Sequence, residues 1–142
     1  MSRWSPQPAS DEPDDVILFD GVCVFCSRWV RFVIDHDRAR RFRFLPIQSE
    51  RGRALATRFG IDPERPQTNA VVLGGRISFK SDAALAVLGL LPATRWLSLL
   101  ARVPRGLRDP IYDRIARNRY AIFGRTEACM VPSADDRARF LT

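Results

Sequence analysis

The sequence predicts an α/β domain in which a four-stranded mixed sheet is flanked by helices. Two runs, Val16-Ile17-Leu18-Phe19 and Ala70-Val71-Val72-Leu73, are apolar at every position, as strands covered on both faces are. Two further runs alternate polar and apolar residues, and helical patterns lie between the strands. With 142 residues, 46% of them hydrophobic, the chain is long enough for one domain with a substantial core.

The chain divides into three parts. Residues 1–15 contain three prolines and four acidic residues, which predicts a disordered leader. Residues 16–92 contain the four strands and form the predicted core. Residues 93–142 are predicted to be a helical C-terminal extension that packs on this core.

The first half of the core is predicted from local patterns. A helix covering residues 27–34 follows the first strand, because neither Gly nor Pro interrupts it. Residues 41–46 alternate charged and aromatic side chains, and their arginines and final proline indicate an edge strand. A second helix is expected from Ser49, its N-cap, to Phe59, with Gly60 ending it.

The second half of the core is predicted to contain a hairpin and a helix. Gly74-Gly75 is a two-residue turn that joins the apolar strand 70–73 to residues 76–80, which alternate and indicate the other edge strand. Ser81-Asp82 is expected to cap a helix that runs to about Leu90. Right-handed crossovers then give the spatial order second, first, third, fourth, which is that of the thioredoxin fold.

Two more helices are predicted beyond the core, at residues 95–103 and 107–123. The second has a broad apolar face, with Arg108, Arg114 and Arg117 outside it. We expect that face to pack on the core. The alternative is an amphipathic helix on a membrane surface, because Trp96 and three leucines lie between Arg95 and Arg102. The apolar face consists of Ile111, Tyr112, Ile115, Ala116, Ile122 and Phe123.

Two cysteines lie where the first strand gives way to the first helix, in the run Asp20-Gly21-Val22-Cys23-Val24-Phe25-Cys26. At a helix N-terminus the unpaired N–H groups and the helix dipole stabilise a thiolate and lower its pKa, so Cys23 is the expected attacking sulfur. Cys26 lies one turn further on among apolar neighbours. We therefore expect Cys26 to point inward and to act as the resolving sulfur.

Other interpretations of the pair remain open. The two cysteines could be half of a zinc site, although the chain has no second pair and only His36 and Cys129 as further ligands. His36 lies ten residues beyond Cys26 on the same predicted helix, roughly 15 Å away. The cysteines could also be inert core residues. A phosphatase of the haloacid dehalogenase type is excluded, because Leu18 occupies the position of the nucleophilic aspartate.

Charge and cysteine content limit the partners and the compartment. Residues 1–15 carry a net charge of −3, so residues 16–142 carry +10, yet no nucleic-acid recognition motif accompanies this charge and nucleic-acid binding is not expected. Three cysteines are too few for a disulfide scaffold, and no apolar run has the length of a signal peptide or of a membrane span. These features predict a cytoplasmic protein.

The motif from Asp20 to Cys26 resembles that of the DCC family of predicted thiol-disulfide oxidoreductases. The resemblance continues in Arg105-Gly106-Leu107-Arg108-Asp109, in Tyr112 and in the segment from Ala116 to Cys129, and so covers nearly everything after residue 15. It implies a thioredoxin-like fold and disulfide chemistry by Cys23 and Cys26. Unlike thioredoxin, the chain has Val24-Phe25 between the cysteines, and Thr68-Asn69 directly before the third strand in place of a proline.

The expected function is thiol-disulfide exchange of the protein-disulfide reductase type, on a protein or a small thiol, with an external reductant and no cofactor. Asp20 is expected to shape the loop before Cys23, with a base for the Cys26 proton as the alternative. Cys129 is expected to pack, with a resolving thiol as the alternative. The rival function is a non-catalytic binding module whose arginine-rich C-terminal helices engage an acidic partner or a membrane.

Overall fold

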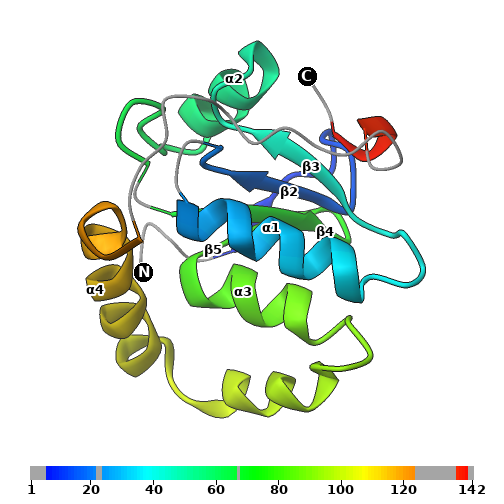
Figure 1. Ribbon diagram of the computed structural model, residues 1–142, viewed down its shortest axis with the longest axis vertical. Helices are drawn as coiled ribbons and strands as arrows, with labels where there is room; N and C mark the ends of the chain where they lie inside the picture. The colour runs from blue at the N-terminus through cyan, green and yellow to red at the C-terminus, as the bar shows by residue number, and fades with distance from the viewer. Residues whose placement is uncertain (1–5, 22–23, 67, 124–136, 141–142) are drawn as a thin grey trace.

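The computed structural model describes residues 6–21, 24–66, 68–123 and 137–140. Its five strands form one sheet in the order β1-β5-β4-β2-β3 (Figure 1). Only β2 and β3 pair in parallel, and the other neighbours are antiparallel. The strands are β1 (Gln7–Pro8), β2 (Val16–Phe19), β3 (Arg43–Pro46), β4 (Ala70–Leu73) and β5 (Arg76–Phe79).

The sheet has one strand more than the sequence predicted. β1 comes from the segment expected to be a disordered leader, and it places Gln7 opposite Ile77 of β5. The N–H of Ala9, a buried residue, donates to the carbonyl of Gly75 at 2.8 Å. β5 was predicted to be an edge strand but lies inside the sheet. Alternation in a sequence reports which faces are buried, and it carries no information on whether the backbone edge is paired.

Ion pairs also hold the N-terminal segment. Arg58, the last residue of α2 (Glu50–Arg58), lies 2.9 Å from Asp11 and 2.5 Å from Glu12. The hydrogen bond from Arg58 lowers the pKa of the Asp11 carboxyl below its usual value. Residues 11 and 12 are thereby attached to the helix that covers one face of the sheet.

Helices cover both faces of the sheet, as the two wholly apolar strands predicted. α1 (Val24–His36) and α3 (Lys80–Leu88) lie on one face, and α2 lies on the other (Figure 1). Alternate residues of the central strands therefore enter two separate cores. Ile17, Phe19 and Val71 pack with Val30, Val33, Ala83 and Val87, whereas Val16, Leu18, Ala70 and Val72 pack with Leu55, Ala56 and Phe59.

α2 begins where the sequence predicted and lies close to the end of β3. Ser49 Oγ accepts a hydrogen bond from the Gly52 N–H at 3.0 Å and donates one to the Pro46 carbonyl at 2.8 Å. A Cβ atom on Gly52 would lie 1.9 Å from that carbonyl oxygen. Only glycine permits this approach. The predicted end of the helix is also confirmed, because Gly60 has a φ of 83°.

The start of α3 differs from the prediction. Its N-cap is Phe79, without a side-chain capping bond, and the Lys80 N–H donates instead to Thr68 Oγ1 at 2.7 Å. Ser81 and Asp82, predicted as the cap, face the C-terminal helices. Asp82 accepts from Arg105 at 2.6 Å, and Ser81 donates to Asp109. Charged partners distant in sequence thus compete successfully with the local cap.

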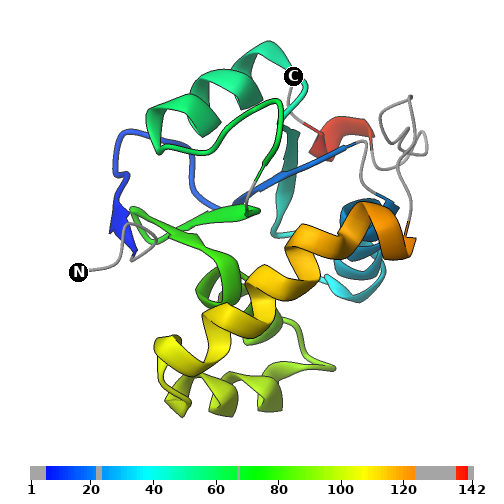
Figure 2. The same ribbon diagram turned by 90° about the vertical axis from the view of Figure 1, so that its left-hand side faces the viewer.

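The C-terminal extension contains the 3-10 helix η1 (Arg95–Arg102) and the long helix α4 (Arg105–Phe123). α4 packs against α3 and α1 (Figure 2). The prediction for its faces was partly wrong. Arg108, expected outside the packed face, lies 3.1 Å from Asp82 and is largely buried, whereas Ile111, expected on that face, is 65% exposed. In the described ranges, no helix has the length and apolar character needed to cross a membrane.

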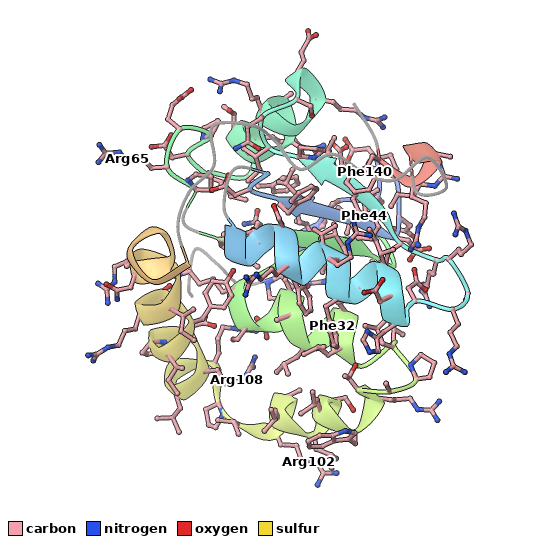
Figure 3. The ribbon with its side chains drawn as sticks, viewed as in Figure 1. Phe32, Phe44, Arg65, Arg102, Arg108 and Phe140 are labelled. Atoms are coloured by element: carbon pink, nitrogen blue, oxygen red, sulfur yellow. The ribbon has the colours of Figure 1, made fainter. Side chains whose placement is uncertain are left out.

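The short helix η2 (Arg137–Arg139) returns the chain to β3. Arg139 Nη2 lies 2.5 Å from Asp37 Oδ2, and both side chains are buried. Asp37 also accepts the Phe42 N–H at 2.9 Å, and Arg139 donates to the Phe42 carbonyl at 3.1 Å. Next to this pair, the Phe140 ring lies 5.3 Å from that of Phe44 (Figure 3). A buried ion pair thus joins the C-terminal segment to the start of β3.

Substituting Gly52 with alanine should destabilise the fold. The new methyl group would overlap the Pro46 carbonyl, so we expect Gly52→Ala to lower the free energy of unfolding by about 2 kcal/mol or more. Gly106→Ala is the matched control, because nothing lies within 4 Å of a Cβ there and alanine favours a helix. Urea unfolding of both variants measures the difference. Equal effects would show that α2 does not depend on this close approach.

Removing one partner of the buried ion pair should cost more than breaking an exposed pair. Arg139→Met leaves the Asp37 carboxylate buried without its cation, and we expect a loss of about 3 kcal/mol. Arg53→Met, which breaks the exposed pair with Glu64, should cost under about 1 kcal/mol. Thermal and urea unfolding test this. A loss at Arg139 no larger than that at Arg53 would contradict the anchoring role.

Candidate functional site

Two polar side chains meet where the parallel strands β2 and β3 end. Asp20 follows β2 directly and is 1% exposed, and Gln48 follows β3 by two residues. Gln48 Nε2 donates to Asp20 Oδ1 at 2.8 Å, and the Gly21 N–H donates to Gln48 Oε1 at 2.8 Å. One amide group therefore connects the buried carboxylate to the backbone of the loop that precedes Cys23.

This loop is attached on its other side to α1. Ser27 Oγ donates to the Gly21 carbonyl at 3.4 Å. Asp20 was expected to act on the loop directly, and the structure adds Gln48 as the link between them. Sequence reasoning missed Gln48, although a signal was present: the carboxyl ends of neighbouring parallel strands share one edge of the sheet.

Cys26 is the third residue of α1 and is buried, with 4% of its surface exposed. The predicted inward orientation is thus confirmed. Cys23 immediately precedes Val24, where α1 begins, and lies outside the described residues. Cys129 also lies outside them. The functional roles assigned to the three cysteines from the sequence therefore stay predictions.

A cavity of about 220 Å³ lies beside Cys26. α1, β4, α3 and α4 all contribute to its wall, and most of the side chains are apolar. They include Trp29, Val71, Ala83, Val87 and Ile115. Cys26 thus faces a space of the size of a few side chains or a small organic molecule, within an apolar surrounding.

Polar groups at the cavity tie α4 to the start of β4. Thr68 Oγ1 donates to the Asn69 carbonyl at 2.6 Å, and the Asn69 N–H donates to Tyr112 Oη at 3.2 Å. Lys80 Nζ lies 2.6 Å from Asp113 of α4. These contacts fix the segment 68–69, which occupies the place directly before the third predicted strand. The helix α4 is therefore a wall of the site.

Within the described part of the chain, no three His, Cys, Asp or Glu side chains are grouped so as to hold a metal ion. His36 lies at the opposite end of α1 from Cys26. Its ring stacks on Phe32, with 4.2 Å between ring centres, and its Nδ1 lies 2.8 Å from the Phe32 carbonyl oxygen. The contacts of His36 are therefore with its own helix.

Comparison with known proteins identifies relatives over most of the chain. A family model described as DCC1-like thiol-disulfide oxidoreductase matches residues 17–125. The chain is 38% identical to a chloroplastic DCC family protein of Arabidopsis thaliana, over 89% of this chain and 76% of that protein. It is also 38% identical to the uncharacterized protein YuxK of Bacillus subtilis (strain 168), over 91% of this chain and 95% of that protein.

No solved structure matches the chain. The family match includes the loop at Asp20, both cysteines and all of α4, and it contains every residue that lines the cavity. This protein belongs to the DCC1-like thiol-disulfide oxidoreductase family.

Proposed function

We propose that this protein is a thiol-disulfide oxidoreductase of the protein-disulfide reductase type, which exchanges a Cys23–Cys26 dithiol with a disulfide on a protein or a small thiol. The observation that carries the proposal is the position of Cys26, buried in the first turn of α1 and facing an apolar cavity. Family membership supports the same class of chemistry.

The reaction proceeds by two thiol-disulfide exchanges. The Cys23 thiolate attacks one sulfur of the substrate disulfide, which breaks that bond, forms a mixed disulfide and releases the first substrate thiolate. The Cys26 thiolate then attacks the Cys23 sulfur and releases the second substrate thiolate. Two electrons have passed to the substrate, and the Cys23–Cys26 disulfide remains. An external dithiol reductant restores the enzyme, and no cofactor takes part.

Asp20 acts in this scheme as a positioning residue. Its carboxylate accepts the amide hydrogen of Gln48, and the same amide group holds the Gly21 N–H. The pair therefore sets the course of the loop from β2 to α1, and with it the position of the helix terminus that activates Cys23. A reducing compartment such as the cytoplasm suits a reaction that consumes dithiol reductant.

Reduction of insulin by the full-length chain, with dithiothreitol as the electron source, tests the proposal. We expect the natural protein to reduce insulin faster than dithiothreitol alone does, and Cys23→Ser to give no increase over dithiothreitol alone. A non-catalytic binding module would show no rate above that of dithiothreitol alone. Such a result would overturn the proposed function.

The two cysteines should react differently with an alkylating reagent. Cys23 is predicted at the helix terminus, so it should be alkylated first by limiting iodoacetamide, whereas the buried Cys26 should react slowly. Removing Cys23 should abolish exchange, and Cys26→Ser should stall as a mixed disulfide with the substrate. Mass spectrometry of brief reactions measures the labelling. Preferential or equal labelling of Cys26 would contradict the assigned roles.

Asp20 and Gln48 should differ in how they tolerate substitution. Asp20→Asn keeps an oxygen that can accept from Gln48, so we expect most of the activity and an unchanged pH profile. Gln48→Leu removes both hydrogen bonds, and we expect about tenfold lower activity, in line with about 1.5–3 kcal/mol for a hydrogen bond to a charged group. A pH profile that shifts in Asp20→Asn would instead identify Asp20 as a base.

A further inference from the structure

A set of large apolar side chains lies exposed on η1 and α4. On η1, Trp96 is 68% exposed, and Leu99 and Leu100 follow it at the spacing of one helical face. On α4, the exposed residues Leu107, Ile111 and Ile115 recur every fourth position and form a stripe along the helix. We call these six residues, together with Arg95, Arg102, Arg114 and Arg117, the η1/α4 surface.

The two helices are close neighbours, since η1 ends at Arg102 and α4 begins at Arg105. η1 lies at the end of the molecule away from α2, and α4 runs from there along one side toward α1 (Figures 1 and 2). Arg102 lies at the η1 end, whereas Arg65 lies in the half of the molecule that contains α2 (Figure 3).

On the C-terminal helices the acidic side chains face α3, whereas most arginines face outward. The two acids of α4 face α3, where Asp113 pairs with Lys80 and Asp109 accepts a hydrogen bond from Ser81. Arg108 also faces inward, toward Asp82. By contrast, the charged residues of 90–118 that are exposed overall, Arg95, Arg102, Arg114 and Arg117, are all arginines. The Asp113 carboxylate is 36% exposed but pairs with Lys80. The outer side is therefore apolar and predominantly cationic.

We propose that the η1/α4 surface docks the protein on an anionic lipid bilayer. Exposed Trp and aliphatic side chains enter the boundary between headgroups and acyl chains, while the arginines bind lipid phosphates. Such a bilayer is negative over its whole surface, which suits a predominantly cationic surface. An acidic protein segment would complement the arginines by charge alone, whereas a bilayer also accommodates the exposed apolar side chains.

Docking in this way would bring the redox site close to the lipid. Ile115 belongs to the exposed stripe and also lines the cavity beside Cys26. One wall of the cavity is therefore part of the docking surface. The docking proposal itself does not depend on the proposed redox chemistry, and binding can be measured with reduced or oxidised protein.

Co-sedimentation of the full-length chain with vesicles tests the proposal. We expect binding to vesicles of equal parts phosphatidylglycerol and phosphatidylcholine, weaker binding as salt is raised, and little binding to phosphatidylcholine alone. Tryptophan fluorescence should be quenched by brominated lipid. This quenching should fall in Trp96→Phe, which retains binding, because Trp4 and Trp29 lie elsewhere in the chain.

Paired variants separate docking from general charge effects. Trp96→Ser with Leu99→Ser, and separately Arg95→Gln with Arg102→Gln, should each weaken vesicle binding about tenfold or more. Arg51→Gln with Arg65→Gln removes the same charge from exposed positions elsewhere and should change binding less than about twofold. Circular dichroism establishes that each variant is folded, and insulin reduction in solution should be unchanged in all three.

Four results would overturn the proposal. These are equal binding to both kinds of vesicle, equal losses in the Arg51/Arg65 control, self-association through Trp96 without vesicle binding, and binding of polyglutamate that matches vesicle binding and does not require Trp96. The last result would identify an acidic protein as the partner. A natural protein that binds vesicles but does not reduce insulin would instead count only against the proposed redox function.

Discussion

The burial of β2 on both faces is the constraint on which the rest of the structure depends. All four of its residues are apolar, and such a strand is stable only at the centre of a sheet with helices on either side. The carboxyl end of β2 therefore lies inside the protein, where the buried carboxylate of Asp20 requires a hydrogen-bond donor. Gln48, at the end of the parallel neighbour β3, supplies that donor and also accepts the Gly21 N–H. The loop before the cysteine pair is shaped by this requirement.

A second polar system, between α3 and α4, forms the other side of the site. Lys80, Ser81 and Asp82 at the start of α3 bind Asp113, Asp109, Arg105 and Arg108 of α4. The segment Arg105-Gly106-Leu107-Arg108-Asp109, which lies within the family match, thus connects α4 to α3. Because these contacts use the acids of α4, the outer side of that helix has mainly arginines and aliphatic residues. The same contacts hold α4 in place, and α4 provides Tyr112, Ile115 and Ala116 to the wall of the cavity beside Cys26 and part of the surface proposed to dock on lipid.

Patterns among neighbouring residues predicted one set of features correctly. The two apolar strands predicted a sheet covered on both faces, and Gly74 and Gly75 predicted the turn, in which both have positive φ. Ser49 predicted the start of α2, and the apolar neighbours of Cys26 predicted its burial. Each of these follows from a pattern within a few residues, and each was found in the structure.

Contacts between residues far apart in the chain became visible only in the folded protein. β1 was missed because Gln7 pairs with Ile77, and a backbone edge leaves no mark in the side-chain pattern. Gln48 was missed because its partner, Asp20, is 28 residues away, and the orientation of α4 was partly wrong because Arg108 is drawn inward by Asp82. The spacing of apolar residues along the chain shows only how apolar each face of a helix or strand is. The physical reason for the difference is that a charge or an amide takes its position from its partner, and partners are brought together only by the fold.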